Sequence, residues 1–524
     1  MKSLVLCLMF ITALTANAQT DNTPNWSVTS EDYYKTGTMM VSDAAGNAIT
    51  IGDRPSYLGD AYIFIRKFDV VGNLLWEQTD TVGIDWYWQK PRWVNTDDDN
   101  NIYVAGYRYT GTSDFYTSEI VALKYDPNGN LLWKTVVDHA WPGALPMRSC
   151  LDSENNFYIG TVGLSPGFTL IKFDTEGNVV FNVADASALN QSFTSMRLKD
   201  DLVVLTSYGG NGSILSVAAF NTNGDFLWSH SLESRGGMDV EIDDDLNVYL
   251  LSRKLNQVSF TSDFDVKIYK FNSDGLLLDE FNYDFGTTID FSNRMTLVNN
   301  KISIIGQTIP LVGGYMDWLT FQIDLEGNLL WEAHYNGMLS NDEIAYWITA
   351  NEEGDVFVSG KGGPAYIDFN GSQYLQFVTL KYHNGQMMWS DTNPYQGYTG
   401  IVSALDNNCG IYVLGETSMT VNHYTDDCIS NSTDESISLK TDELTVFPNP
   451  AKDFTTLKFD MSQGEKMRIV IYNTMGELIQ EMDTRSIHSG ANQMTISLVG
   501  WSDGVYLVTV IGERFSRSVI LNKQ

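Results

Sequence analysis

Cysteine, proline, histidine and basic residues are scarce in this chain, and each shortage narrows what the protein can do. The 524 residues include four Cys, 12 Pro, six His and 32 Lys plus Arg, against 65 Asp plus Glu. A formal charge of −33 repels phosphate backbones, so we expect no nucleic-acid partner. The six His are scattered without metal-ligand spacing, so we expect no dedicated metal centre.

Long apolar runs are also missing, apart from one near the N-terminus. Residues 4–14 are mostly apolar, follow Lys2 and precede Ala16-Asn17-Ala18. This arrangement predicts a secretory signal peptide over residues 1–18. No later stretch reaches the roughly 18 apolar residues that a membrane helix needs, so we expect no transmembrane segment.

The three cysteines beyond the signal peptide cannot all pair with one another. Cys409 and Cys428 are close in sequence and would be exported to an oxidising compartment, so we predict a disulfide between them. Cys150 is then left as a buried free thiol.

What the chain has in quantity is repetition. A phrase of the form Lys-aromatic-Asp-x-x-Gly-Asn-Leu-Leu-Trp occurs seven times, with glycines 47 to 58 residues apart. Each copy predicts two short strands around a tight turn whose Gly supplies a positive φ. The copies lie at residues 67–76, 124–133, 172–181, 219–228, 270–279, 322–331 and 381–389.

A second strand-turn-strand phrase alternates with the first and occurs eight times. Its copies lie at residues 41–52, 94–106, 150–160, 196–207, 240–252, 296–306, 348–360 and 403–415. Two hairpins per period give four antiparallel strands, which must stack around an axis to bury both faces. The sequence therefore predicts an all-β chain with an eight-bladed β-propeller over residues 19–428, or alternatively a seven-bladed one. We expect the segment around Trp26 to supply the outer strand that the last period lacks.

The repeats resemble the quinoprotein-like and lyase-type propeller repeats of secreted bacterial proteins. The resemblance covers roughly residues 25–425 and speaks to fold rather than to function. Trp76, Trp133, Trp228, Trp331 and Trp389 close the phrase and are interpreted as blade-to-blade packing residues. Phe181 keeps an aromatic ring there and Asp279 does not, so the fifth blade should pack differently.

A polar, acidic linker over residues 429–443 separates the repeats from a C-terminal region with strand-period alternation. We expect residues 444–524 to form a small Ig-like β-sandwich. Its motifs resemble the type A sorting domain of the type IX secretion route, and they include Pro448, Asn449, Pro450, Gly504, Tyr506 and Lys523. The resemblance implies the type IX secretion machinery as a partner, and a secreted or outer-surface location reached through the periplasm.

Candidate ligand-binding residues lie outside the repeat register, in or beside the longer connections between strands. Aromatic rings there suit stacking on sugars or anchoring a protein, and arginines suit carboxylate or sulfate groups. The candidates are Trp86, Trp88, Arg92, Trp93, Arg108, Trp141, Arg148 and Trp347. Arg92, Arg148, Arg197 and Arg294 should lie around one mouth of the channel, unless they pair with carboxylates such as Asp239, Asp290 or Asp342.

Two functional hypotheses remain open at this point. The first is a secreted or surface-displayed binding protein for a polysaccharide or an envelope protein. The second is a polysaccharide lyase or hydrolase that uses the same propeller face, the one with the longer connections. No catalytic residue can be named for it. We expect no cofactor, although the acidic turns such as Asp97-Asp98-Asp99 leave Ca²⁺ as an alternative to plain solvated turns.

Overall fold

The computed structural model describes most of both folded regions and no described residue is helical. The described residues are 20–21, 23–30, 35–54, 62–80, 89–112, 115–141, 146–162, 167–185, 191–209, 214–234, 237–258, 261–285, 288–310, 316–336, 343–367, 373–393, 400–406, 409–416, 419–425, 445–452, 454–461, 467–473, 478–484, 490–502, 504–511 and 516–524. They include no helix long and apolar enough to cross a membrane. The predicted signal peptide lies outside them, and so does the predicted linker.

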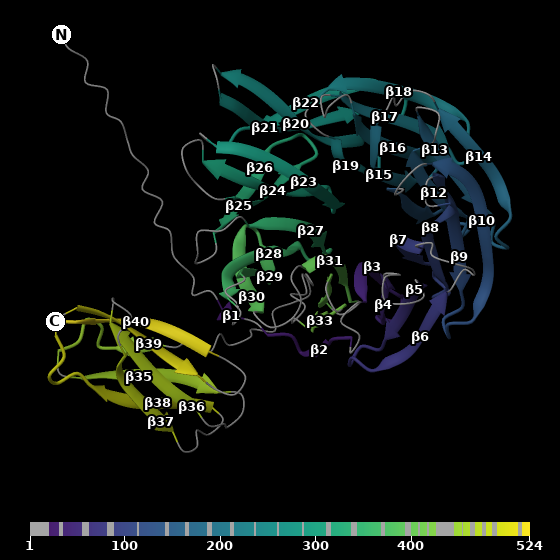
Figure 1. Ribbon diagram of the computed structural model, residues 1–524. Coiled ribbons are helices and arrows are strands. Elements are labelled where there is room, and N and C mark those ends of the chain that lie inside the picture. Colours follow the sequence, from purple (N-terminus) through teal and green to yellow (C-terminus); the bar gives the residue numbers. More distant parts are fainter. Residues whose placement is uncertain are drawn as a thin grey trace, which may run out of the picture. The chain divides into compact units, whose positions relative to one another are not determined.

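Eight antiparallel sheets follow one another around a central channel, which confirms the eight-bladed propeller (Figure 1). Blades 1 to 4 comprise β3 (Thr36–Ser42), β4 (Ala48–Arg54), β5 (Tyr62–Phe68), β6 (Leu74–Asp80); β7 (Gln89–Thr96), β8 (Ile102–Thr112), β9 (Phe115–Tyr125), β10 (Leu131–Trp141); β11 (Arg148–Leu151), β12 (Phe157–Val162), β13 (Phe168–Phe173), β14 (Val179–Asp185); and β15 (Gln191–Lys199), β16 (Leu202–Gly209), β17 (Ile214–Asn221), β18 (Phe226–Glu233).

Blades 5 to 8 continue the same order, with the first strand of each blade innermost. They comprise β19 (Gly237–Ile242), β20 (Val248–Val258), β21 (Thr261–Phe271), β22 (Leu277–Tyr283); β23 (Thr288–Val298), β24 (Lys301–Pro310), β25 (Asp317–Asp324), β26 (Leu329–Tyr335); β27 (Ile344–Ala350), β28 (Asp355–Ile367), β29 (Gln373–His383), β30 (Gln386–Asn393); and β31 (Gly400–Leu405), β32 (Ile411–Gly415), β33 (Val421–Tyr424).

The N-terminal segment closes the ring, as the sequence predicts. Strand β2 (Trp26–Val28) pairs antiparallel with β33 and so becomes the fourth strand of blade 8. Strand β1 (Thr20–Asp21) adds to the outer edge of blade 7, parallel to β30. Both strands cover edges that would otherwise expose unpaired backbone groups.

In every blade but the seventh, an aromatic residue of the outer strand packs on the turn glycine of the following blade. In blade 7, Trp389 stacks on Tyr424 of blade 8 instead. Gly129 has φ +86°, and a Cβ added to it would lie 2.8 Å from the Trp76 ring. The Trp76 indole N–H donates to the Pro127 carbonyl 3.0 Å away in the same turn. The other pairs are Trp26 with Gly72, Trp133 with Gly177, Phe181 with Gly224, Trp228 with Gly275 and Trp331 with Gly385. The interpretation of these residues as blade-to-blade packing is therefore confirmed for these contacts.

The fifth blade does pack differently. Asp279 stands where the other blades have an aromatic residue, and Phe281, two positions later in β22, covers Gly327 instead. Since side chains alternate along a strand, a shift of two keeps the ring on the same face.

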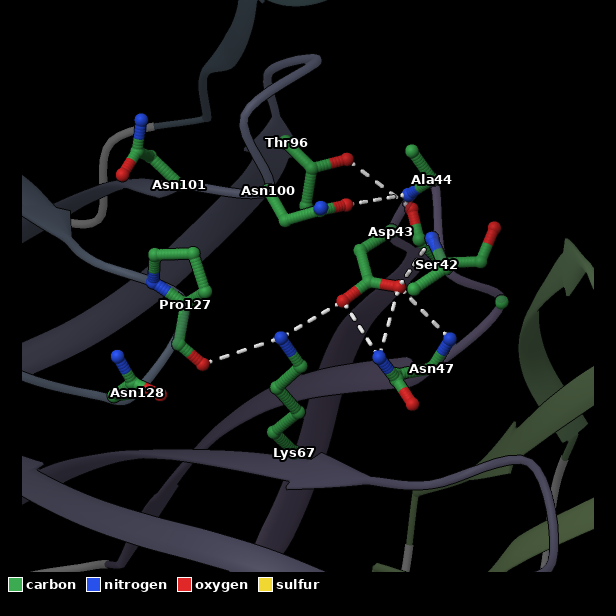
Figure 2. Close-up of polar contacts among 12 residues, drawn as sticks. Ser42, Asp43, Ala44, Asn47, Lys67, Thr96, Asn100, Asn101, Pro127 and Asn128 are labelled. Atoms are coloured by element: carbon green, nitrogen blue, oxygen red, sulfur yellow. Dashed lines mark hydrogen bonds and ion pairs between the residues drawn. The ribbon is translucent and has the colours of Figure 1, made fainter.

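The short turns tie neighbouring blades together through their polar side chains. Figure 2 shows the first of them, in which Asp43 accepts hydrogen bonds from Asn47 and forms an ion pair with Lys67, at 2.8 Å. Lys67 also donates to the Pro127 carbonyl of blade 2, at 3.2 Å. The Ala44 N–H donates to the side-chain oxygen of Asn100, also in blade 2, at 2.8 Å. The acidic turn side chains therefore serve the fold.

The C-terminal unit is a two-sheet sandwich. One sheet has the order β34 (Thr445–Phe447), β35 (Phe454–Met461), β38 (Gly490–Ser497); the other has the order β37 (Leu478–Thr484), β36 (Met467–Asn473), β39 (Gly504–Ile511), β40 (Ser516–Lys523). Leu457, Ile471, Ile496 and Val508 are fully buried between the sheets. This is consistent with the predicted Ig-like unit.

The described cysteines agree in part with the sequence-based prediction. Cys150 is a free thiol, but it is half-buried rather than fully buried. Cys409 is not free. Cys428 lies outside the described residues, so its pairing with Cys409 stays a prediction.

Candidate functional site

The innermost strands of seven blades enclose a cavity of about 460 Å³. Its volume falls in the range of roughly 300–1,000 Å³ that is typical of small-ligand sites. The lining residues are Thr38, Met39, Arg92, Trp93, Pro146, Met147, Arg148, Phe193, Thr194, Arg294, Trp347 and Val402. They come from every blade except the fifth, so the cavity belongs to the central channel (Figure 1).

A β-bulge in the innermost strand explains why successive residues both reach the cavity. In blade 2, Pro91 pairs with Gly106 and Trp93 pairs with Ala105, so Arg92 is the extra residue. Along a regular strand neighbouring side chains point to opposite faces, but a bulge re-aims them. The same bulge recurs in blades 1, 4, 5, 6, 7 and 8.

In blades 6 and 7 the bulge leaves no room for a side chain at the facing position of the second strand. A Cβ on Gly306 would lie 1.7 Å from the Phe291 carbonyl oxygen, and one on Gly360 would lie 2.2 Å from that of Ile344. The equivalent positions end each copy of the second repeat phrase, and all are Gly or Ser. A residue as large as Ser is accepted in blades 4 and 5, and blade 3 has Gly160 at this position without a bulge, so the small residue alone does not identify the bulge.

One wall of the cavity is aromatic and apolar. The Trp93 and Trp347 rings, from blades 2 and 7, have centroids 6.0 Å apart and planes tilted by 41°. Both rings pack against a core cluster that includes Met39 and Val402 of the two blades between them. The tryptophans thus meet over blades 1 and 8, and each keeps part of its ring exposed.

Another wall carries positive charge stacked on this aromatic pair. The Arg294 guanidinium carbon lies 3.9 Å from the Trp347 ring centroid, and that of Arg148 lies 4.7 Å from the Trp93 ring. Arg92 stacks on Tyr107 at 5.2 Å and donates to its hydroxyl at 3.2 Å. Cation–π contacts of this kind hold a guanidinium in place without using its N–H donors.

Blade 5 contributes two buried carboxylates. Glu241 accepts two hydrogen bonds from Arg197, at 2.7 and 2.9 Å, in a bidentate pair. Asp239 lies 3.5 Å from Arg148 and 4.0 Å from Arg197. The predicted alternative, pairing of arginines with carboxylates, therefore applies fully to Arg197, weakly to Arg148, and not to Arg294 among the described residues.

Burial and charge shift the pKa values of these groups in opposite directions. Burial lowers the pKa of Arg294 to about 9, and the positive charge of Arg148 adds to this. Burial also lowers the pKa of Arg148 to about 10, although Asp239 opposes it. For Arg197, Glu241 and Asp239 outweigh burial, and its pKa is raised. The charges of Arg148 and Arg294 are thus the least compensated.

Four of the eight sequence-predicted ligand-binding residues converge here, namely Arg92, Trp93, Arg148 and Trp347. Arg108 does not, because its guanidinium forms an ion pair with Glu119 and it does not line the cavity. Trp86, Trp88 and the side chain of Trp141 lie outside the described residues. Sequence reasoning missed Met39, Phe193 and Val402, whose apolar side chains look like ordinary core.

The carboxylate oxygens of the acidic turns accept hydrogen bonds within the fold. Asp97 accepts from the backbone and side-chain amides of Asn101, and from the Tyr103 hydroxyl at 3.1 Å. No group of three or more His, Cys, Asp or Glu side chains suited to a metal ion occurs in the part of the chain that the structure describes. Whether the turns bind Ca²⁺ stays a prediction.

The sorting motifs meet in the C-terminal unit although they are far apart in sequence. The Asn449 side-chain oxygen accepts a hydrogen bond from the Asn522 N–H at 2.8 Å. Ala451, directly after Pro450, bridges to Lys523, which also pairs with Gly504. The Tyr506 hydroxyl donates to the Ser502 carbonyl, at 2.7 Å, and its ring is buried. The motif residues therefore join the first and last strands of the sandwich.

Comparison with known proteins identifies the C-terminal unit. Residues 445–521 match the model of the secretion system C-terminal sorting domain. The unit is thus a type IX sorting domain, as predicted, and the protein is secreted or displayed on the cell surface. No curated protein matches the sequence.

Several solved structures resemble the chain at 11% identity. The Dos1 propeller has a TM-score of 0.44, covering 77% of this chain and 94% of that one. PorZ, a surface component of the type IX secretion system of Porphyromonas gingivalis, has a TM-score of 0.28, covering 94% and 82%. An ulvan lyase of polysaccharide lyase family PL25 has a TM-score of 0.38, covering 76% and 96%. Likeness at this level carries no argument about function.

Proposed function

We propose that this protein is a non-catalytic binding protein that uses the channel cavity to bind a polysaccharide outside the cell. The observation that carries the proposal is the pair of partly exposed tryptophans, Trp93 and Trp347, at the wall of a cavity that three arginines also line. Indole faces stack on the apolar faces of sugar rings, and guanidinium groups donate to sugar hydroxyl or acid oxygens.

An enzyme on the same site is the alternative, and the geometry supports it less. A lyase mechanism would need an arginine and a tyrosine that both reach the substrate. Arg92 and Tyr107 are within hydrogen-bond distance, but Tyr107 is 1% exposed and does not line the cavity. Asp239 and Glu241, the nearby carboxylates, are held by arginines. None of these groups is placed to move a proton on a bound sugar.

The proposal is tested with a glycan array probed by the purified full-length chain and by Trp93→Ala and Trp347→Ala variants. Tyr346→Ala is the matched control, because it removes the neighbouring aromatic ring, which does not line the cavity. Binding to a glycan that falls in both tryptophan variants and persists in the control supports the proposal.

A reducing-end and unsaturated-end assay on every glycan that binds separates binding from catalysis. New chain ends would establish the lyase or hydrolase alternative. Absence of binding to all glycans by a chain with an intact thermal transition would overturn the polysaccharide proposal, and would leave an envelope protein as the partner to seek.

A further inference from the structure

The channel region holds more positive charge than it neutralises. Four arginines, Arg92, Arg148, Arg197 and Arg294, surround two carboxylates, Asp239 and Glu241. The balance of these six groups is two positive charges, in a chain whose formal charge is −33. A local excess of this sign is the reverse of the rest of the molecule.

The excess is concentrated on two side chains. Among the described residues, neither Arg148 nor Arg294 makes a hydrogen bond, and the 3.5 Å approach of Arg148 to Asp239 is the only ion pair of either. The Nε atom of Arg92 is also buried without a hydrogen-bond partner. Each guanidinium carries five N–H groups, so the cavity wall presents many unused donors.

Asp239 relieves this excess only in part, because its single negative charge lies beside both Arg148 and Arg197. It accepts a hydrogen bond from the Ser195 hydroxyl at 2.6 Å, and others from the backbone N–H groups of Val240 and Met295 at 3.1 and 3.3 Å. These neutral donors fix the carboxylate within the wall of blades 4, 5 and 6. The donors of Arg148 and Arg294 are left facing the cavity that they line.

Removing a guanidinium group from water is costly unless its charge and its N–H groups find partners, and an anionic ligand would supply them. Arg148 is buried with one long ion pair, and Arg294 is half-buried with none among the described residues. Arg148 and Arg294 are held by stacking on Trp93 and Trp347, which fixes their positions and leaves their N–H groups available. This arrangement presents two guanidinium groups beside two indole faces. Carboxylate and sulfate oxygens match guanidinium donors, and sugar rings match indole faces.

We propose that the cavity selects an acidic sugar, whose carboxylate or sulfate group is bound by Arg148 and Arg294 while its ring lies against Trp93 or Trp347. This inference rests on the proposed function and narrows it to anionic polysaccharides. Because strands of seven blades surround the cavity, the acidic sugar enters as a chain end or as a substituent rather than from the middle of a rigid chain.

The test is calorimetric titration of the full-length chain with three tetrasaccharides: an oligogalacturonate, a heparin-derived sulfated fragment and cellotetraose, which is neutral. We expect the acidic probes to bind and the neutral one not to bind. Arg148→Gln and Arg294→Gln should each weaken binding of the acidic probes at least about tenfold. Arg108→Gln, with the same change in charge away from the cavity, should leave it within about twofold.

The acidic probe that binds more tightly distinguishes carboxylate from sulfate recognition. Equal binding of cellotetraose and the acidic probes, unchanged in both arginine variants, would overturn this inference while leaving the proposed function in place. Failure of all three probes would overturn this inference, and the glycan array decides separately on the proposed function. A measurement that needs no variant is the thermal transition of the unaltered chain, which should rise with the concentration of the acidic probe that binds and not with cellotetraose.

Discussion

The outer strands and the innermost strands of this propeller follow opposite rules. In the outer strands one contact is repeated, an aromatic ring over the next blade's turn glycine, as with Trp76 and Gly129. In the innermost strands the backbone bulge repeats, but the side chain on it changes from Thr38 to Arg92 to Thr194. The outer contact recurs because seven of the eight blades meet the following blade in the same way. Side chains at the channel meet no such requirement, and the chemistry of the molecule is gathered there.

The bulge is the feature that the innermost strands share, and breaking it should have the largest effect. Gly306→Ala places a Cβ against the Phe291 carbonyl, so we expect a loss of about 3 kcal/mol in the free energy of unfolding. Chemical denaturation followed by tryptophan fluorescence measures it. Gly354→Ala is the control: there an added Cβ meets nothing, and only the φ of +91° opposes it, at about 1 kcal/mol. Equal losses in the two variants would show that the bulge tolerates a side chain.

The repeated outer contact should tolerate a smaller ring but not its removal. Trp133→Ala uncovers Gly177 and loses the indole hydrogen bond to Thr175, so we expect a cost of about 2–3 kcal/mol. Trp133→Phe should cost less than about 1 kcal/mol, because Phe181 fills the same place in the next blade. Thermal unfolding of both variants checks this. If Phe were as costly as Ala, the hydrogen bond rather than the ring would hold the blades.

Much of the fold could be predicted from the sequence because its contacts repeat from blade to blade. Part of the site could be predicted because its residues depart from the repeat. The repeated turn glycines predict the number of blades, and the segment around Trp26 predicts the strand that closes the ring. Both predictions depend on local turn chemistry and strand period. The bulge escaped prediction, since a two-for-one pairing is a property of two strands and not of either one. The role of Phe281 was not predicted either, because its ring lies two positions after Asp279, the residue at the repeat's aromatic position. Arg92 and Trp347 were found because they stand outside the repeat.

The arginines of the channel should differ from one another in what they contribute to stability. Arg197→Gln leaves the Glu241 carboxylate buried without its bidentate partner, so we expect a cost of about 2 kcal/mol. Arg294→Gln removes a charge that forms no ion pair among the described residues, so the free energy of unfolding should stay within about 0.5 kcal/mol. Paired denaturation curves measure the difference. A large loss for Arg294→Gln would assign it a structural role and weaken the case for a ligand.

The smallest effect is expected at Cys150, where chemistry rather than stability is the readout. Burial raises the pKa of its thiol to about 12, so at pH 8 only roughly one molecule in 10⁴ carries the reactive thiolate. Iodoacetamide should therefore leave the native chain unmodified, with reaction increasing as the pH rises. In denaturant without reductant, mass spectrometry should find Cys150 alkylated, and Cys409 and Cys428 protected by the predicted disulfide. An alkylated Cys409 in that sample would refute the pairing.

Because β2 completes blade 8, the propeller can close only after nearly all of its sequence has been synthesised. Ser27 and Asn422, whose side chains meet at 2.7 Å, are 395 residues apart in sequence. Strand β2 is synthesised early and has no pairing partner in blade 8 until β33 has been synthesised. A chain cut short before Val421 lacks β33, so β32 and β2 both lose the strand that pairs with them. The sorting domain follows β33 in the sequence, so it is synthesised only after the last strand that the ring needs for closure.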